Sequence, residues 1–329
     1  MRWRARLTVP VFVLLAMGFI GVPATLQAGQ EPPSEPAVAD GVALSTQIQS
    51  FAQDLERLRR FMGVSRINEL DIGIRSALPR DLYFQALMLW ENTDRLSFEI
   101  LREHTKPPPA PPGGLELQDV LIRIRDAHQN LRQAMRQLQI VDTGGAMTGN
   151  GIPATDSFTA LLTLNRQLNL LLERHIAPSD VYEEITLAIG YAARLLAPYP
   201  DAIRIPAEPP FEPDKLPRDV YLRLIECLRS IVRIFDMQGL AVLTIETSRI
   251  DLDRVNPGDV YLVAAMIVSQ LDFLYQRLGS AKPPPQPIYP GLKFPAHSYQ
   301  RAGILLAQLQ QLQRHLAPGQ AAPPLPEPR

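Results

Sequence analysis

The chain of 329 residues contains one cysteine and two tryptophans. The single cysteine, Cys227, excludes an intramolecular disulfide framework, so apolar packing must hold the fold together. The 33 basic and 34 acidic residues nearly balance, whereas a nucleic-acid partner requires a basic face. The sequence also lacks the motifs His-Glu-x-x-His, Cys-x-x-Cys and Cys-x-x-Cys-His. We therefore expect no nucleic-acid partner, no cofactor, no metal and no enzymatic activity.

The N-terminal segment predicts export. Three arginines within the first six residues precede an uncharged apolar run at positions 7–22. That run is shorter than the roughly 20 residues of a transmembrane helix, and its layout is typical of a secretory signal peptide. We expect cleavage after Ala28, with Ala24 and an uncleaved anchor as alternatives. The sequence therefore predicts a periplasmic or secreted protein that contacts the membrane only through an uncleaved signal anchor, if at all.

The 32 prolines separate the chain into helices and connectors. They collect in five clusters, and a helix interior rejects proline at a cost of about 3 kcal/mol. The segments between the clusters are interrupted by charges, so we expect no later membrane span. The predicted divisions are a signal peptide (1–28), a disordered linker (29–40), a first helical region (41–141), a second helical region with repeats (152–317) and a disordered tail (318–329).

Several helices are predicted to begin with the motif Pro-x-Asp-apolar-Tyr. Proline suits the first turn of a helix because its missing N–H would be unpaired there, and the aspartate supplies a charge and an acceptor to that turn. The starts at Asp180, Asp219, Asp259 and His297 are spaced by 39, 40 and 38 residues and the step from Asp81 to Asp119 is 38, and such a period is the mark of a repeat architecture. Clear copies start at Pro79, Pro178, Pro217 and Pro257, a degenerate copy starts at Pro295, and weaker copies surround Asp119 and Asp156.

One apolar stripe recurs in all seven aligned segments. Counted from the motif aspartate, positions +1, +5, +8, +12 and +15 are almost all apolar, and steps of 4, 3, 4 and 3 place them on one helix face. In the segment from Asp219, for example, these positions are Val220, Leu224, Cys227, Ile231 and Ile234. An eighth helix has the same steps without the motif, with Leu44, Ile48, Phe51, Leu55, Leu58 and Met62.

These patterns predict an all-α fold of about eight amphipathic helices from a repeat of about 38–40 residues, joined by Pro-rich connectors. Connectors of about 15–20 residues can return along a helix and let the next one run parallel, which favours one or two multi-helix bundles. An α-solenoid is the alternative, but solenoids of this period use two or three helices per repeat. The short connector from His175 to Pro178 predicts an antiparallel hairpin. The segments 67–74 and 239–245 fit either a short strand or a short buried helix.

The recurring tyrosines are the candidate ligand-binding residues. They lie at +2, beside the core stripe, where a tyrosine more often packs against a neighbour and hydrogen-bonds a backbone group. We therefore favour a structural role over a ligand-binding one. The candidates are Tyr83, Tyr182, Tyr221, Tyr261 and Tyr299.

Other candidates have structural interpretations. Cys227 lies at +8 of its stripe, where a buried small hydrophobe is expected. The glycine-rich segment 144–151 lacks the Lys and Ser/Thr of a phosphate-binding loop. Asp251 and Asp253 lack the glycine and glutamate of an EF-hand.

Two functions remain. The first is a non-catalytic exported helical-repeat protein that acts as a structural or protein-interaction module of the cell envelope, with envelope proteins as partners. The alternative is a helical-bundle sensor or carrier that binds a small ligand or metal. A cavity lined by the repeat tyrosines, or two histidines within coordination distance, would favour the alternative.

Overall fold

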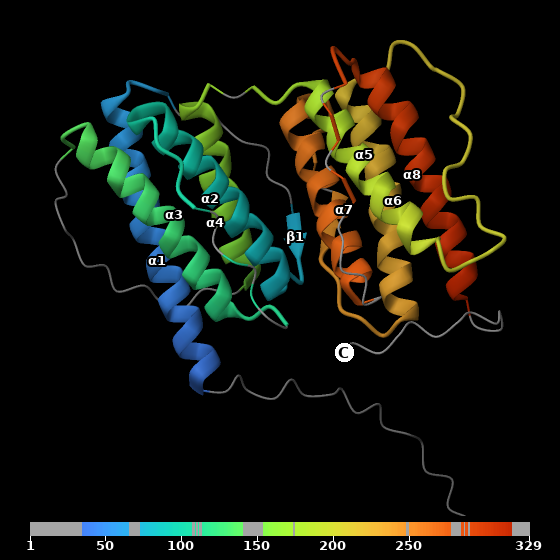
Figure 1. Cartoon of the computed structure of the whole chain (residues 1–329), viewed down its shortest axis with the longest axis horizontal. Helices are drawn as coiled ribbons and strands as arrows, with labels where there is room; N and C mark the ends of the chain where they lie inside the picture. The colour runs from blue at the N-terminus through green and yellow to red at the C-terminus, as the bar shows by residue number, and fades with distance from the viewer. Residues whose placement is uncertain are drawn as a thin grey trace, which may run out of the picture. The chain divides into compact units, whose positions relative to one another are not determined.

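The computed structural model is mostly α-helical, as the sequence predicts (Figure 1). The part of the chain that the structure describes contains eight α-helices: α1 (Glu35–Phe61), α2 (Pro79–Leu101), α3 (Leu117–Gln137), α4 (Ala154–Leu171), α5 (Pro178–Leu195), α6 (Pro217–Met237), α7 (Pro257–Arg277) and α8 (Pro295–Leu316). The residues that the structure describes are 35–65, 73–106, 109, 111, 114–140, 154–173, 175–247, 250–277, 284–285, 287–288 and 290–317. The predicted signal peptide (1–28), the tail (318–329) and the glycine-rich segment 144–151 lie outside them.

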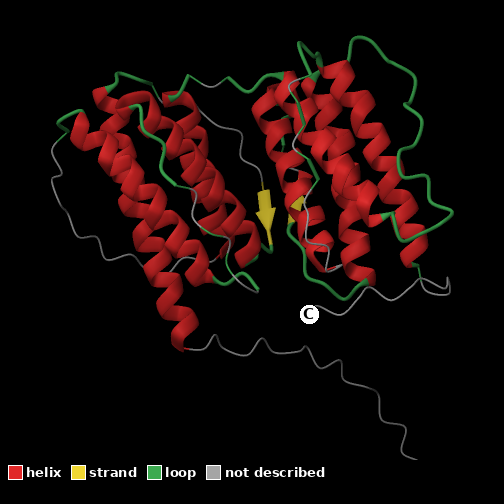
Figure 2. Ribbon diagram, viewed as in Figure 1, coloured by secondary structure: helices red, strands yellow, loops and turns green. Residues whose placement is uncertain are grey.

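Two short strands accompany the helices among the described residues (Figure 2). The strands β1 (Gly73–Arg75) and β2 (Thr244–Glu246) pair antiparallel, with Ile74 opposite Ile245. Each strand overlaps the end of a segment in which the sequence permits a strand. A 3₁₀ turn, η2 (Leu252–Arg254), precedes α7.

The helices pack as two four-helix bundles. In the first bundle, α1 and α2 each pack against α3 and α4; in the second, α5 and α6 each pack against α7 and α8. Two separate apolar clusters follow this division. The order of contacts around each bundle is therefore the same, with consecutive helices such as α1 and α2 facing each other across the core.

Within each bundle the four helices run parallel (Figure 1). In the second bundle, the first turns of α5, α6, α7 and α8 meet at one end, where Pro178, Pro217, Pro257 and Pro295 surround a small hollow. Connectors of 15 to 21 residues join consecutive helices inside a bundle. A helix of 21 residues is about 31 Å long. An extended connector of 15 to 21 residues is longer than that and can return along the whole helix. The long connectors thus account for the parallel arrangement.

The hairpin predicted around His175 is wrong. α4 packs against α1 and α2, whereas α5 packs against α7 and α8, so the segment between Leu171 and Pro178 joins the two bundles. Its six residues span about 20 Å when extended, which is enough to reach the next bundle. The predicted second helical region, 152–317, therefore contains one helix of the first bundle.

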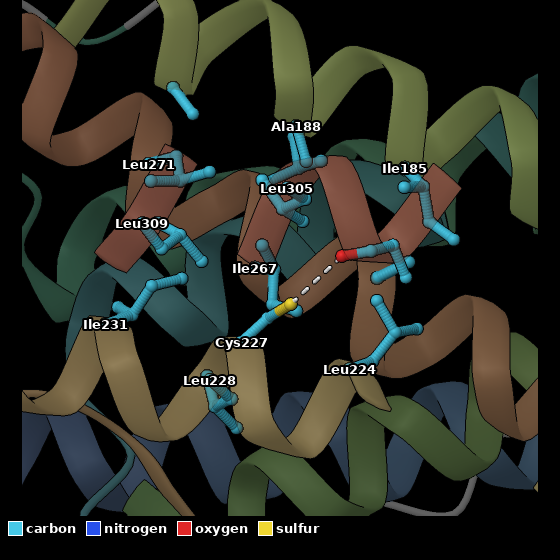
Figure 3. Packing of buried hydrophobic residues seen from close by; sticks show 14 of the residues in the cluster. Ile185, Ala188, Leu224, Cys227, Leu228, Ile231, Ile267, Leu271, Leu305 and Leu309 are labelled. Atoms are coloured by element: carbon cyan, nitrogen blue, oxygen red, sulfur yellow. Dashed lines mark hydrogen bonds between the residues drawn. The ribbon is translucent and has the colours of Figure 1, made fainter. Parts of the chain in front are cut away.

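The predicted stripe forms the core of both bundles. All its positions in the seven aligned helices, and the equivalent residues of α1, are at most 5 % exposed. Figure 3 shows Cys227 at the centre of the second core, among Leu224, Ile267 and Leu305. Met62 is the exception: it is 41 % exposed because α1 ends at Phe61, before the stripe reaches it.

The N-terminal end of α1 differs from the prediction. The helix begins at Glu35, so the segment 35–40 of the predicted disordered linker is helical. Pro36 is its second residue, and proline is tolerated there because first-turn N–H groups have no intrahelical partner.

The motif aspartates hold the helix starts. Each accepts a hydrogen bond from the backbone N–H three residues earlier, for example Leu216 N to Asp219 Oδ2 at 2.8 Å. Where the N-cap residue is apolar, as Leu216 is, only this half of a capping box forms, whereas Asn256 at the start of α7 also accepts from the Asp259 N–H and completes the box. The same bond is made in α2, α3, α5 and α7, and in α8 His297 Nδ1 takes the place of the carboxylate.

α7 is the most buried of the helices. Most of its residues are buried, because one face lies in the second core while Leu262 and Met266 belong to the first. Its length and composition are sufficient for a membrane span, although 72 % of its most apolar 18-residue stretch is buried inside the protein. Burial from two sides explains the membrane-like composition of this helix.

The stripe assignment predicts very different costs for two leucines of α6. Leu224→Ala removes a side chain that is 0 % exposed and should lower the free energy of unfolding by about 2–5 kcal/mol. Leu222→Ala, at a position that is 43 % exposed on the same helix, should change it by less than about 0.5 kcal/mol. Denaturant unfolding of both variants measures the difference, and equal losses would contradict the assignment.

Candidate functional site

The candidate site is a cleft between the two bundles. It has a volume of about 480 Å³ and is lined mainly by α2 of the first bundle and by α5 and α7 of the second, with Asn169 as the single lining residue of α4. A cavity of this size can hold a small organic molecule. The side chains that carry its chemistry are Arg80, Tyr83, Phe84, Glu91, Glu184, Tyr191, Tyr261, Asp272 and Phe273.

Two of the five candidate tyrosines line this cleft. They are Tyr83 of α2 and Tyr261 of α7, whereas Tyr182, Tyr221 and Tyr299 lie elsewhere. The two come from different bundles and meet because α7 packs on the first bundle. The candidates therefore do not form one continuous row.

Three of the tyrosines contact an arginine on a neighbouring helix of the same bundle. The guanidinium of Arg123 lies 5.5 Å from the Tyr83 ring centroid, and its Nη2 donates to the Tyr83 hydroxyl at 2.9 Å. The guanidinium of Arg223 lies 3.3 Å from the Tyr299 ring centroid. Counted from the motif aspartate of its own helix, or from His297 in α8, each tyrosine is at +2 and each arginine is at +4. Arg301 makes the third such contact, 5.2 Å from the ring of Tyr182.

Tyr221 is fully buried and has a valine, Val263, at +4 of the neighbouring helix. Burial raises the pKa of its hydroxyl, and the charge of Asp259 adds to the effect. The corresponding neighbour of Tyr261 is Glu184, which lines the cleft with it. The +4 position beside a +2 tyrosine therefore holds a valine next to the buried Tyr221, but a glutamate, Glu184, next to Tyr261 in the cleft.

Asp272 is the cleft carboxylate with the best-defined contacts. It accepts hydrogen bonds from the Tyr191 hydroxyl and, at 2.7 Å, from Gln276 Nε2. Burial raises the pKa of Asp272 despite these bonds. Burial and the nearby Asp272 also raise the pKa of Tyr191, whose ring packs edge-on against Tyr275. The tyrosine is therefore neutral at physiological pH and acts as a donor.

Arg80 supplies the positive charge in the cleft wall. Its guanidinium lies 4.2 Å from the Phe273 ring centroid and 5.3 Å from that of Phe235. It donates to the Ala241 carbonyl at 2.6 Å and to Gln270 Oε1 at 3.2 Å. Burial lowers the pKa of Arg80, although the neighbouring aspartate opposes this shift. These contacts hold the charge against the second bundle.

Polar contacts between the bundles fix the cleft walls. Gln270 Nε2 donates to Asp81 Oδ1 at 2.5 Å, and Arg166 Nη2 pairs with Asp259 Oδ1 at 2.8 Å. Burial raises the pKa of both aspartates against their partners' influence. Both aspartates are motif residues, so the groups that cap α2 and α7 also join the bundles.

A buried polar cluster joins α1 to α3. His128 Nε2 and Arg132 Nε both lie 2.8 Å from Asp54 Oδ2, and Gln47 Nε2 lies 2.7 Å from His128 Nδ1. Burial would raise the pKa of Asp54, but the hydrogen bonds and charges of His128 and Arg132 keep it below its ordinary value. The cluster ties two helices together inside the first bundle.

Two other candidates from the sequence, Cys227 and Asp253, lie apart: the first is buried in the core and the second is at the surface. Cys227 is fully buried, its Sγ lies 3.7 Å from the Ala302 carbonyl oxygen, and burial raises the pKa of the thiol (Figure 3). Asp253 pairs with Arg218 at the surface. Among the described residues, no group of three or more His, Cys, Asp and Glu side chains is arranged to hold a metal ion.

Sequence reasoning missed several residues of the cleft. Tyr191, Asp272 and Phe273 lie late in their helices, outside the aligned motif. A usable signal was the composition of α7, which has seven consecutive apolar residues from Leu262 to Val268. A helix that is apolar on all sides is buried on all sides, which marks α7 as the helix between the two bundles.

No protein-family model, curated protein or solved structure matches this chain.

The tyrosine–arginine contacts predict a selective loss of stability. Arg223→Met keeps the aliphatic stem but removes the charge over Tyr299 and the hydrogen bond to its carbonyl, and it should cost about 1 kcal/mol. Arg229→Met, at an exposed position of the same helix, should be close to neutral. Thermal unfolding of the two variants compares them. An equal effect would show that the ring contact contributes nothing.

Proposed function

We propose that this protein is a non-catalytic exported binding protein, a helical-bundle sensor or carrier, whose ligand occupies the cleft between the two bundles. The cleft of about 480 Å³, lined by two repeat tyrosines, carries this proposal. Its walls combine aromatic rings with a few polar groups, which is the usual composition of a small-molecule site. The protein would act in the periplasm or outside the cell, without a nucleic-acid partner.

The architecture suits a carrier because rigid elements position the cleft. Its lining residues stand largely on helices whose opposite faces are fully buried in the two cores. Side chains on such helices are held more closely than side chains on loops. The contacts Gln270–Asp81 and Arg166–Asp259 set the spacing of the walls.

A repeat origin for the helices also belongs to this proposal. The two bundles share one order of contacts and one set of buried positions. α4 and α8, which occupy equivalent places, both have a serine at +1, Ser157 and Ser298, and both are buried. We infer that one helix was duplicated into eight, and that the cleft arose where two four-helix units met.

A structural or protein-interaction module of the envelope is the second candidate. Two connector residues, Phe211 and Phe294, are about half exposed, and both rings lie within 6 Å of His297 at the start of α8. Leu292, nearby in sequence, is 74 % exposed. Exposed apolar groups of this kind favour contact with another protein.

Filling the cleft should separate the two candidates. Ser269 lies in the cleft wall on α7, so Ser269→Trp should displace a ligand, whereas Gln137→Trp on the exposed surface of α3 should not. We would incubate each full-length variant with a small-molecule extract of the exporting cells and record native mass spectra. The carrier proposal predicts a stoichiometric adduct on the unmodified chain and on Gln137→Trp, and none on Ser269→Trp.

Leu87→Trp, on the opposite wall, provides a second blocked variant, and circular dichroism checks that each variant is folded. An adduct that survives in both blocked variants would overturn the cleft as the site. Absence of any adduct, together with capture of one stoichiometric envelope protein, would favour the interaction module instead.

A further inference from the structure

We propose that the cleft binds an extended organic cation that carries two or more ammonium groups. This inference rests on the proposed function, because it takes the cleft to be the binding site and names the class of its ligand.

The charge of the lining is negative. Glu91 of α2, Glu184 of α5 and Asp272 of α7 place carboxylates on three different helices. The positive charge of Arg80 is held by two phenylalanine rings and by the Ala241 carbonyl. An anionic ligand would meet three carboxylates, whereas a cation would be attracted to them.

The aromatic lining recognises the same class. Ammonium groups bind over aromatic faces, and they do so more strongly where water is excluded. Tyr83, Phe84, Tyr191 and Tyr261 all line the cleft. Arginines elsewhere in this protein already use the geometry, as Arg223 does over Tyr299. Phe273 is engaged by Arg80 and Tyr83 by Arg123, so we assign recognition to the other three rings.

The separation of the carboxylates distinguishes an extended cation from a metal ion. A bound metal needs several ligands around one point, and the described residues contain no such group of His, Cys, Asp and Glu side chains. Carboxylates from three helices suit separate charges along one molecule. The volume of about 480 Å³ accommodates a linear triamine.

The test uses spermidine, a linear triamine, titrated into the full-length protein by calorimetry. We expect saturable 1:1 binding that weakens as salt is added. Octane-1,8-diol and suberate, of similar length but neutral or anionic, should not bind measurably. Asp272→Asn and Glu184→Gln should each lower the affinity about tenfold, because each removes one charged partner of an ammonium group.

Glu183→Gln is the matched control, since Glu183 is the adjacent residue on α5 but does not line the cleft. It should leave the affinity unchanged. A Lys-Ala-Lys peptide tests whether the ammonium groups belong to a protein partner; tighter binding of the peptide than of spermidine would overturn the small-molecule proposal. Absence of saturable binding, or equal binding by Asp272→Asn and the unmodified chain, would also overturn it.

The cleft-blocking variants separate failure of this inference from failure of the proposed function. If spermidine does not bind but Ser269→Trp still loses the adduct from the cell extract, the site stands and the ligand class is wrong. If the adduct survives in Ser269→Trp, the site itself is wrong, and the proposed cation falls with it.

Discussion

The common direction of the four helices in each bundle is the constraint on which the rest of the structure depends. Because the helices start at one end, equivalent positions lie at the same height, and one stripe can build every layer of the core. The same alignment lets a tyrosine at +2 reach the side chain at +4 of its neighbour, as Tyr299 reaches Arg223. It also brings four positive helix ends together. The motif aspartates, such as Asp219, supply negative charge at these ends. The helices of the second bundle run in the opposite direction to those of the first (Figure 1).

Local patterns made much of this fold predictable. The stripe and the motif indicated which residues are buried and where most helices begin, because both depend on a single helix and its first turn. Long connectors indicated parallel neighbours. The place of α4 was not predictable in this way: a short connector limits a distance but does not decide which bundle a helix joins. The contact between Arg166 and Asp259, 93 residues apart, has no local signal at all.

The cleft shows the same limit. Tyr83 and Tyr261 were candidates because they recur, yet recurrence reflects packing within each bundle, and only the meeting of the bundles brings these two together. Glu184 and Asp272 belong neither to the motif nor to the apolar stripe, so the sequence alone does not single them out. They gain significance because they line one cleft together with aromatic rings of both bundles, and the proposed cation depends on that cleft.

Spin-label distances test the parallel arrangement most directly. Labels at Arg218→Cys and Asn256→Cys mark the starts of α6 and α7, and a second pair, Arg218→Cys with Gln276→Cys, marks opposite ends; Cys227 is buried and should not be labelled. α7 has 21 residues and is about 31 Å long, so the first distance should be shorter by roughly 20 Å. A first distance longer than the second would contradict the parallel bundle, and with it the layers, the tyrosine–arginine contacts and the cleft.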